Sequence, residues 1–567
     1  MSGQERLCVL FFVSTMTAQE PTCRLEGQVV DSRTEPVAGA TLFAECNGKV
    51  VGRTQSDAAG MFVFGHLPQD YVLVRATTPA PDVAAAWIDL LGEPRTFLPL
   101  VTMPARAVTG SVRDDAGQPV AGAWIVTAPY DAGDLGLASC TAVSDASGRF
   151  RLTHVPFGRN VLRAWAPGHD AFEATVNDTG DVTLDCRIER DATQERTFVL
   201  IGATAAQCAA ARLDVSVLHA GCPLPLPPAM RNPPLGADGL WCLRGWPYAD
   251  EMRASIAGSD LAFTPTEHTV PADVPARRRE FELATGDAAR IKGRLVGVGA
   301  LGGVTLVAQP ITKDLQPRRV LTRTLDDGTF ELPALVATGE SFALRLLSRE
   351  HVVQTRENAR AWFVASHTPS TLHAVAIAKA HHVRLRVIGG TGRPIAGARI
   401  SILGRCRPPR VLTVVGIEDM PTWRIASGIT DAEGTEEITG LELLTDEQLL
   451  CAVTSPEGYE VRSFQVAAGA TTDLGDLTLV PTASVRVVVT DPAGQPWPGA
   501  RVQIQTYGAF DWRVRHVAAD RTGEILVRGL EPGMHGFRLL SETEDQQQVP
   551  LPADVITTVT LRENGDH

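Results

Sequence analysis

Hydrophobic and polar residues alternate in short runs along this chain of 567 residues, and four of these runs share one register. The apolar positions of each run end seven residues before a proline. Alternation with a period of two is typical of a half-buried β-strand. We therefore expect four equivalent strands, with apolar positions Leu25/Gly27/Val29, Val108/Gly110/Val112, Val383/Leu385/Val387 and Val485/Val487/Val489.

Nearly the same ten residues follow each of these strands. They read DSRTEPVAGA at 31–40, DDAGQPVAGA at 114–123, GGTGRPIAGA at 389–398 and DPAGQPWPGA at 491–500. Glycine admits a positive φ, while proline fixes φ and ends strand pairing. The stretch predicts a β-hairpin connection into a second strand, with structural turn residues Pro36, Gly39, Pro119, Gly122, Pro394, Gly397, Pro496 and Gly499.

A second repeated signature places Asp before Gly before a strand, as in SDAAGMFVF at 56–64. The Asp side chain accepts backbone N–H bonds, and Gly takes the left-handed position of a tight hairpin. The predicted turn residues are Asp57, Gly60, Asp145, Gly148, Asp327, Gly328, Asp431, Gly434, Asp520 and Gly523. Calcium takes about six to eight oxygen ligands, and one Asp per turn supplies few of them. We therefore expect no metal at these turns.

The spacing of the four prolines predicts six repeats. Successive prolines lie 83, 275 and 102 residues apart, and the long interval fits three spans of about 92 residues. It should therefore contain two degenerate copies; one is visible at 290–310, and the other is inferred from the spacing and from 211–218 and 252–260. The predicted segments are 1–22 (an N-terminal segment and candidate signal peptide) and β-sandwiches at 23–104, 105–191, 192–287 (degenerate), 288–380 (degenerate), 381–482 and 483–567.

Short, evenly spaced strands separated by turns indicate an all-β chain of sandwiches, each with its own core. The order strand, G.PV.GA, strand, SDA.G.F.L resembles the carboxypeptidase regulatory-like domain. The resemblance implies a transthyretin-like, immunoglobulin-like β-sandwich, a domain common in tandem in exported bacterial proteins. It covers nearly the whole chain after residue 22, strongly in repeats one, two, five and six, partly in repeat four and weakly in repeat three. The expected fold is about six such domains in tandem.

Charge and hydropathy exclude several partners. A formal net charge of −13 disfavours binding to nucleic acid or to anionic lipid, since both attract basic surfaces. No apolar run reaches the roughly 18 residues that a membrane span needs. The N-terminal segment has Arg6 and a short apolar stretch at 7–13, an incomplete match to a signal peptide; a misassigned start codon is the alternative. We expect an extracellular or cell-envelope location, with the cytoplasm as the alternative.

The sequence lacks the motifs that would indicate catalysis. A peptidase of the kind these domains accompany would need zinc, but no histidine has Glu three residues later and His-Glu-x-x-His is absent. Gly-x-Ser-x-Gly and Gly-x-x-x-x-Gly-Lys are also absent. GVGALG at 297–302 joins two predicted strands, whereas a dinucleotide fold needs a strand and then a helix. We predict no enzyme, no catalytic residues and no cofactor; an active site between repeats is the alternative.

One aromatic cluster is a candidate ligand site. Trp241, Trp246 and Tyr248 lie close together in LWCLRGWPYADE, within the least regular repeat. Aromatic side chains at this spacing can pack in a core or can stack on a sugar ring. The sequence leaves both alternatives open.

The ten cysteines fall mostly in pairs within repeats. The candidate disulfides are Cys23/Cys46, Cys140/Cys186 and Cys406/Cys451, and such pairs suit an oxidising compartment. The alternative is a set of small buried thiols in a reducing cytosol.

These observations predict a non-catalytic array of sandwiches that serves as an exported surface scaffold, a spacer or an adhesion module. The alternative is a carbohydrate-binding accessory protein of a polysaccharide-processing system. The protein or polysaccharide partner is not identified by the sequence. Short polar segments such as 103–106 and 480–484 look like linkers and favour a semi-rigid rod.

Overall fold

The computed structural model describes residues 22–46, 49–80, 82–90, 95–129, 140–169, 171–176, 180–189, 195–219, 222–224, 226, 240–244, 251–257, 263–264, 267–271, 278–283, 290–297, 299, 301–311, 319–334, 336, 338–348, 350–353, 363–368, 371–404, 423–441, 448–455, 457–466, 470–507, 512–540 and 546–563. Their regular structure consists of 44 β-strands and one α-helix. No helix in these ranges is long and apolar enough to cross a membrane.

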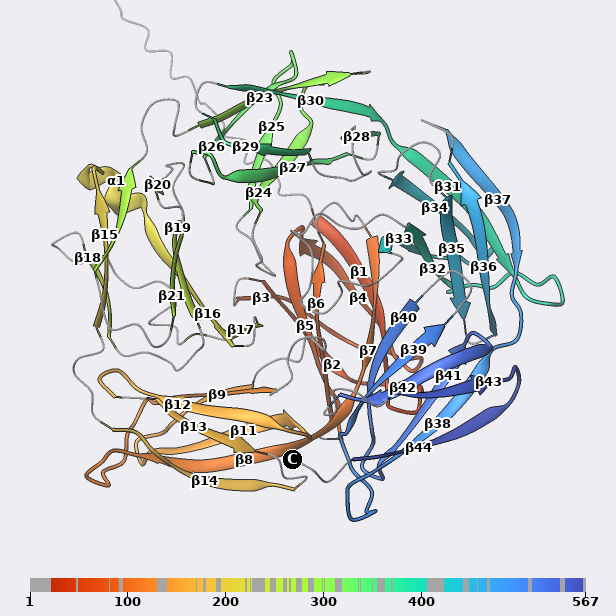
Figure 1. The fold of residues 1–567 in the computed structure, drawn as a ribbon, viewed down its shortest axis with the longest axis horizontal. Coiled ribbons are helices and arrows are strands. Elements are labelled where there is room, and N and C mark those ends of the chain that lie inside the picture. The colour runs from red at the N-terminus through yellow and green to blue at the C-terminus, as the bar shows by residue number, and fades with distance from the viewer. Residues whose placement is uncertain are drawn as a thin grey trace, which may run out of the picture.

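Six consecutive groups of strands each form two facing sheets with the same pairing. In every group, the first strand pairs antiparallel with the fourth and parallel with the last, and the second strand pairs with the third and the fifth. The third and fourth groups each add one short strand to the sheet that holds the first strand. This confirms the expected fold class of tandem β-sandwiches, which we number 1 to 6 along the chain (Figure 1).

Sandwich 1 contains β1 (Thr22–Val30), β2 (Thr41–Cys46), β3 (Lys49–Gln55), β4 (Met61–Pro68), β5 (Tyr71–Thr77), β6 (Asp82–Asp89) and β7 (Arg95–Val101). Sandwich 2 contains β8 (Met103–Arg113), β9 (Trp124–Pro129), β10 (Cys140–Val143), β11 (Arg149–Pro156), β12 (Asn160–Trp165), β13 (Phe172–Val176) and β14 (Val182–Arg187). Sandwich 3 contains β15 (Glu195–Ile201), α1 (Ala205–Ala210), β16 (Arg212–His219), β17 (Cys222–Leu224), β18 (Leu240–Arg244), β19 (Glu251–Ala257), β20 (Phe263–Thr264), β21 (Glu267–Pro271) and β22 (Arg279–Leu283).

Sandwich 4 contains β23 (Arg290–Gly297), β24 (Thr305–Pro310), β25 (Val320–Arg323), β26 (Thr329–Pro333), β27 (Ser341–Leu347), β28 (His351–Val353), β29 (Phe363–Ser366) and β30 (Leu372–Lys379). Sandwich 5 contains β31 (His381–Ile388), β32 (Arg399–Gly404), β33 (Trp423–Ile429), β34 (Thr435–Leu441), β35 (Gln448–Ser455), β36 (Gly458–Gln465) and β37 (Thr471–Thr478). Sandwich 6 contains β38 (Ala483–Thr490), β39 (Arg501–Tyr507), β40 (Trp512–Ala518), β41 (Glu524–Leu530), β42 (Gly533–Leu539), β43 (Gln547–Leu551) and β44 (Ile556–Arg562).

The two repeated turns connect strands of different sheets, so the prediction that they form β-hairpins is wrong. The ten-residue stretch joins β1 to β2, and the Asp–Gly turn joins β3 to β4; neither pair shares a sheet. In the first stretch the chain folds back only far enough to pair Pro36 with Val30. It then passes to the other sheet, where β2 begins. The sequence therefore predicted the local turn but not the strand with which the following strand pairs. Turns within one sheet and turns between two sheets use the same residues.

The two turns interlock at one end of each sandwich. In sandwich 1, the N–H of Val29 donates to the carbonyl of Gly60, 2.8 Å away. Gly60 has a φ of +71°, and a Cβ there would lie 2.4 Å from the Val29 carbonyl oxygen, so only glycine fits. A buried hydroxyl completes the contact in four sandwiches: Ser56, Ser144, Thr324 and Thr430. Sandwich 6 has Ala519 at this position, without a side-chain hydroxyl.

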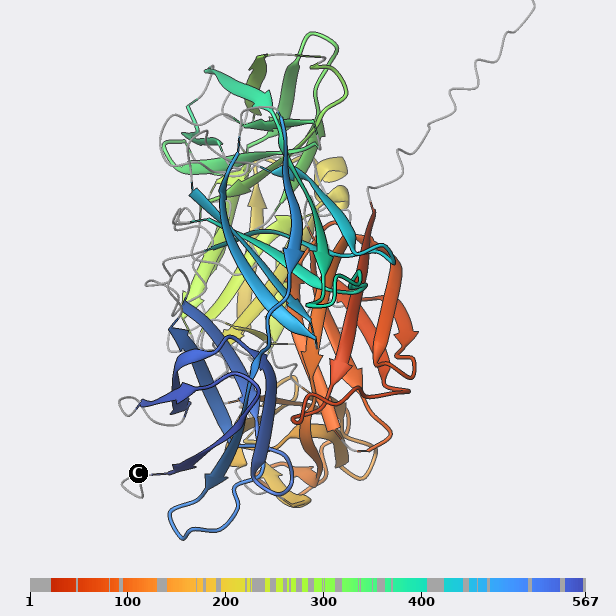
Figure 2. The ribbon, with the colours of Figure 1, turned by 90° about the vertical axis from the view of Figure 1, so that its right-hand side faces the viewer.

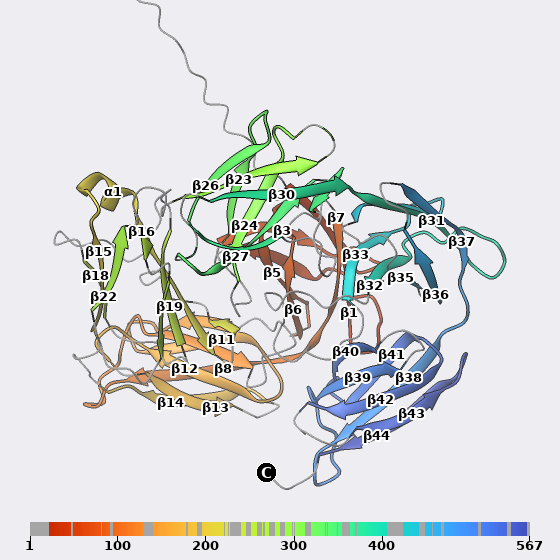
Figure 3. The ribbon, with the colours of Figure 1, turned by 45° about the horizontal axis from the view of Figure 1, so that its top comes forward.

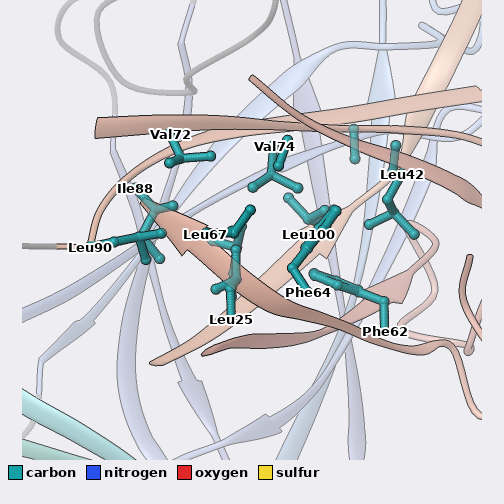
Figure 4. Close-up of a cluster of buried hydrophobic side chains, with 14 of the residues drawn as sticks. Leu25, Leu42, Phe62, Phe64, Leu67, Val72, Val74, Ile88, Leu90 and Leu100 are labelled. Carbon is teal, nitrogen blue, oxygen red and sulfur yellow. The ribbon is translucent and has the colours of Figure 1, made fainter. Parts of the chain in front are cut away.

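The core of each sandwich lies between its two sheets. In sandwich 1, Leu25 and Leu67 of one sheet face Leu42 and Val74 of the other (Figure 4). Gly27 on β1 leaves room for an aromatic ring, since a Cβ there would lie 2.2 Å from the Phe62 ring. The alternating residues seen in the sequence thus form a core that buries apolar area on both sheets.

The sandwiches form a closed arrangement. Sandwiches 2 to 6 follow one another around sandwich 1, and their sheets with the second strand face the middle (Figures 1 and 3). The view turned by 90° shows that sandwich 1 lies toward one side of this circuit (Figure 2). We call the middle-facing sheet of each sandwich its inner sheet.

The connections between sandwiches are shorter than the sequence suggested. Segment 103–106 is the start of β8, and it continues the sheet of sandwich 1 because Val83 of β6 pairs with Met103. The predicted boundary at 104/105 thus falls inside a strand. Only Thr102 separates β7 from β8, and only Ala380 separates β30 from β31. The closed arrangement corrects the expectation of a rod, because sandwiches 2 to 6 lie around sandwich 1 (Figure 1).

Candidate functional site

Sandwich 1 contacts four other sandwiches through residues that the structure describes. It shares a sheet with sandwich 2 and is reached by arginine side chains from sandwiches 4, 5 and 6. A guanidinium suits such contacts, because it stacks on aromatic rings and pairs with carboxylates in a fixed geometry. The chain is biased toward this residue, with only four lysines among its 52 basic residues.

Arg319 of sandwich 4 makes the most buried of the ion-pair contacts to sandwich 1. Its side chain is 5% exposed and lies 4.0 Å above the ring of Tyr71, with Asp70 3.7 Å away. The Arg319 Nε also donates to Gln309 Oε1 at 3.3 Å. Stacking, an ion pair and a hydrogen bond together offset the desolvation of the charge.

Arg319 lies beside the face of sandwich 4's inner sheet that points away from the core of that sandwich. Leu306 and Ala308 of β24 point into the sandwich's own core, so Val307 and Gln309 point away from it. Both are nevertheless fully buried, and Val307 packs with Ala343 in a second small apolar cluster. This sheet face is therefore an interface and not a solvated surface.

Arg399 of sandwich 5 docks on the opposite sheet of sandwich 1. Its guanidinium lies 4.5 Å from the ring centroid of Phe97 on β7 and donates to Gln28 Oε1 at 2.7 Å. Burial lowers the pKa of Arg399 because it disfavours the charged form. Arg399 is the first residue of β32, directly after the repeated Gly-Ala.

Phe157 of sandwich 2 lies between two guanidiniums. Arg106 of the same sandwich is 5.8 Å from its ring centroid, and Arg521 of sandwich 6 is 5.2 Å away. Arg521 also donates to Asp82 Oδ1 at 3.2 Å and to the carbonyl of Ala105 at 3.3 Å. Burial raises the pKa of Asp82, and the neighbouring Arg521 partly opposes this shift.

Two further ion pairs join the first turn of sandwich 1 to sandwich 6, one at its Asp–Gly turn and one on β41. Arg33 donates to Asp520 Oδ2 from Nη2 at 2.9 Å and from Nε at 3.1 Å, and Arg528 donates to Glu35 Oε1 at 2.6 Å. Burial opposes ionisation of Asp520, but hydrogen bonds from Thr522, the backbone and Arg33 outweigh it and lower the pKa. Asp520 thus serves its own turn and a second sandwich at once.

Sandwiches 2 and 3 meet through tryptophan. Trp165 belongs to the buried cluster of sandwich 3, and Trp124 packs against that cluster from the neighbouring strand. By contrast, the inner sheet of sandwich 3 presents exposed polar residues toward the middle, namely Arg212, Asp214 and Ser216 on β16.

The structure describes one of the three residues of the predicted ligand cluster. Trp241 is 1% exposed, pairs with Phe198 across β18 and β15, and lies in the core of sandwich 3. Its ring has no free face for a ligand, so the core alternative describes this residue. Trp246 and Tyr248 lie outside the described residues.

The repeated aspartates bind their own turns. Asp57 Oδ1 accepts the N–H groups of Ala59 and Met61 at 2.9 and 2.8 Å, and Asp145, Asp431 and Asp520 repeat the pattern. In sandwich 4 the turn opens at Leu325, and Asp327 instead accepts from Thr329. No group of three or more metal-ligating side chains occurs among the residues that the structure describes.

Among the cysteines of the three candidate disulfides, the structure shows free thiols at Cys140, Cys186 and Cys451. The Cys46 thiol donates to Asp70 at 3.7 Å, although it shares a buried cluster with Cys23. Cys140 and Cys186 are free, and burial raises the pKa of their thiols to about 11 and about 12. Cys451 is also free, and its predicted partner Cys406 lies outside the described residues.

The crossing of the chain between sheets changes the geometry of the first pair. Cys23 and Cys46 were expected to face each other across a hairpin, but β1 and β2 lie in opposite sheets, and both residues point into the core between them. Buried thiols with raised pKa values stay protonated at neutral pH and react slowly with oxidants.

Comparison with known proteins supports the domain type. The family model of the carboxypeptidase regulatory-like domain matches residues 107–189. Sandwich 2 is similar to this family. The resemblance seen in the sequence is thereby confirmed for that sandwich, and the shared pairing order extends its architecture to the other five. No curated protein matches the chain.

Several solved structures match parts of this chain at low identity. A streptococcal ancillary pilin is 11% identical, with 49% of this chain and 99% of that chain covered and a TM-score of 0.18. The Bacillus anthracis TIE protein is 10% identical, with 78% and 69% covered and a TM-score of 0.14. The minor pilin GBS52 of Streptococcus agalactiae is 14% identical, with 32% and 94% covered and a TM-score of 0.19. Similarity this low carries no argument about function.

Sequence reasoning missed the docking residues. Arg319, Arg399 and Arg521 lie far in sequence from Tyr71, Phe97 and Phe157, and no local pattern links them. One signal was available: the strand position after Gly-Ala is Thr41 in sandwich 1 but Trp124, Arg399 and Arg501 elsewhere. A tryptophan at an outward strand position is unusual for a solvated face, whereas an arginine is common there, so Trp124 alone was a signal in the sequence.

Proposed function

We propose that this protein is a non-catalytic scaffold, in which sandwich 1 holds the other sandwiches in fixed relative positions. The observation that carries the proposal is the buried contact of Arg319 with Tyr71 and Asp70. A spacer gains its length from separated domains, so docked domains favour a scaffold over a spacer. Loops at the free ends of the sandwiches remain available for a protein or polysaccharide partner.

Electron microscopy of the purified full chain tests this proposal. We expect single particles with one arrangement, in which one sandwich is surrounded by the others. The matched comparison is the Arg319→Ala variant, which should broaden the range of arrangements around sandwich 4. Particles of the unaltered chain that resemble strings of beads at variable angles would contradict the proposal.

Carbohydrate binding is the second candidate, and it rests on Trp246 and Tyr248 in the sequence. The buried position of Trp241 removes one member of the cluster. Binding to a glycan panel that is lost in Trp246→Ala and Tyr248→Ala would support this function. The full chain failing to bind any glycan would remove it.

We also propose a cell-envelope or extracellular location, with the cytoplasm as the alternative. The mass of the intact protein from its own cell, before and after reduction, tests this. Loss of the segment 1–22 would support export. A full-length, fully reduced protein would favour the cytoplasm, and that result is also compatible with the buried thiols.

A further inference from the structure

We propose that sandwich 6 is a salt-sensitive arm, which undocks from sandwiches 1 and 2 while the other five sandwiches stay assembled. The proposal adds a movement to the scaffold, and it starts from a difference between interfaces. Three of the described contacts that hold sandwich 6 to sandwich 1 are ion pairs: Arg33–Asp520, Arg528–Glu35 and Arg521–Asp82.

Each of these ion pairs has at least one side chain open to solvent. The side chains of Arg528 and Glu35 are 50% and 54% exposed; Arg33 and Arg521 are each 49% exposed, and their partners Asp520 and Asp82 are 19% and 27% exposed. Attraction between exposed charges is weak and is screened by salt. At about 1 M salt the screening length is only about 3 Å, which is comparable to the separation of the charges.

The apolar part of this interface is small in the described residues. It centres on Phe157 of sandwich 2, which is buried against Arg521 and Gly499. Gly499 is close enough that a Cβ there would lie 2.3 Å from the Phe157 Cβ. One aromatic side chain supplies limited hydrophobic attraction to oppose the loss of the ion pairs.

The other interfaces depend less on exposed charge. Sandwiches 1 and 2 share a sheet through backbone pairing of β6 with β8. Sandwich 3 receives Trp165 of sandwich 2 into its apolar cluster. Sandwich 4 docks through Arg319, whose side chain is 5% exposed and therefore little screened. Salt should thus act first on sandwich 6.

The connection between sandwiches 5 and 6 can act as a hinge. Val480 is still held by sandwich 5, because it exchanges two backbone hydrogen bonds with Tyr459. Thr482 is already held by sandwich 6, since its carbonyl accepts from the N–H of Asp554 at 3.1 Å. Pro481 alone separates the two. Sandwich 6 can therefore rotate as a unit about one residue without breaking its own sheets.

One backbone amide reports docking directly. The N–H of Leu526 on β41 donates to the carbonyl of Ser32 in sandwich 1 at 2.9 Å, so its protection from hydrogen exchange depends on the docked state. The N–H of Leu540 donates to the carbonyl of Arg501 within sandwich 6. The pair distinguishes undocking from unfolding of the sandwich.

Hydrogen exchange of the full chain, resolved to single amides, tests the proposal at low salt and at about 1 M salt. We expect exchange at Leu526 to accelerate with salt while exchange at Leu540 stays unchanged. Protection of Leu526 that does not respond to salt would overturn the proposal. Loss of protection at both amides together would also overturn it, because sandwich 6 would then be unfolding.

Variants sharpen the test. Arg33→Ala combined with Arg528→Ala removes two exposed pairs and should accelerate Leu526 exchange about tenfold at low salt. Arg393→Ala is the control, since Arg393 and Glu457 form an exposed pair inside sandwich 5, with side chains 69% and 48% exposed. An equal effect of the control would contradict the proposal. Rapid Leu526 exchange in the unaltered chain at low salt would instead show that sandwich 6 never docks, which contradicts the closed scaffold itself.

Discussion

Sandwiches 4 and 6 dock on the same central sandwich through different kinds of interaction. Sandwich 4 inserts Arg319 between Tyr71 and Asp70 and buries the outward face of its inner sheet. Sandwich 6 places its Asp–Gly turn and β41 beside the first turn of sandwich 1, and it relies on ion pairs in contact with water. The same repeat therefore supplies one fixed interface and one adjustable interface.

The difference arises from side chains that the fold does not need. Apart from the added β28 of sandwich 4, both sandwiches have the same strand pairing, and both keep apolar residues between their sheets. Their docking contacts differ at outward positions: Val307 and Gln309 on β24 are covered, whereas Asp520 at the turn stays partly exposed. A tandem array can thus vary its interfaces without changing its cores.

The largest effect is expected for Arg319→Ala. This change removes the stacking on Tyr71 and the ion pair with Asp70, and it leaves the buried Gln309 Oε1 without the hydrogen bond from Arg319, at a cost of about 1–3 kcal/mol. Denaturant unfolding of the full chain should show an earlier first transition. Arg323→Ala is the control, because Arg323 is exposed on β25 of the same sandwich. Equal stability of the two variants would remove the contrast between the interfaces.

Gly499→Ala and Gly122→Ala form a matched pair for sandwich 6. Both glycines have a φ of +73°, so alanine costs roughly 1 kcal/mol of backbone strain at either site. Only at Gly499 would the new Cβ collide with Phe157, since nothing lies within 4 Å at Gly122. We expect Gly499→Ala alone to expose the Leu526 amide. Undocking in Gly122→Ala would contradict this explanation.

Thr324→Ala makes sandwich 4 resemble sandwich 6 at the interlocked turns. The Thr324 hydroxyl accepts from the N–H of Val304 and donates to the carbonyl of Leu301. Losing both bonds at a buried site should cost about 1–2 kcal/mol. Sandwich 6 tolerates Ala519 at this position. Calorimetry should therefore show a lower melting temperature for the variant, and an unchanged one would show that the hydroxyl is not required.

Acid should weaken sandwich 4 through His373. Burial, and secondly the neighbouring His367, lower the pKa of His373 below its ordinary value of 6.5. The unfolded chain therefore takes up a proton at a higher pH than the folded chain does, so stability is complete above pH 6.5 and declines as the pH falls below it. His535 of sandwich 6 is also buried, but its ring nitrogens lie near Thr506 and the carbonyl of Glu531.

The check is the melting temperature of the unaltered chain and of His373→Leu across the acid range. The variant should lose less stability on acidification, because it has no imidazole to protonate at this site. Identical pH dependence in the two proteins would contradict the role of His373. The expected effect is the smallest of the four, since other titrating groups share the response.

Local patterns in the sequence predict the strands well. The alternation at Val485, Val487 and Val489 places these side chains in the core of sandwich 6, and Gly494 adopts the expected positive φ. Turn chemistry at Asp57 is equally legible, because its bonds reach only four residues ahead. Spacing also located two copies whose turns had lost the motif.

Pairing over long distances was not predictable. Whether a turn joins neighbours in one sheet or crosses to the other depends on the whole sandwich, so the expectation that Cys23 and Cys46 face each other across a hairpin was wrong. Docking pairs such as Arg319 and Tyr71 obey no spacing rule, and one of the two segments from which the rod was inferred, 103–106, lies within strand β8. The short strands β20 and β28 are too brief to show alternation.

Small-angle X-ray scattering of the full chain at low salt tests the central claim most directly. A closed arrangement around sandwich 1 predicts a radius of gyration of about 25–30 Å, as expected for a compact chain of this length. A rod of six sandwiches, each about 30 Å long along its strands, would instead give about 50 Å. The smaller value would support docking on sandwich 1, and the larger value would contradict it.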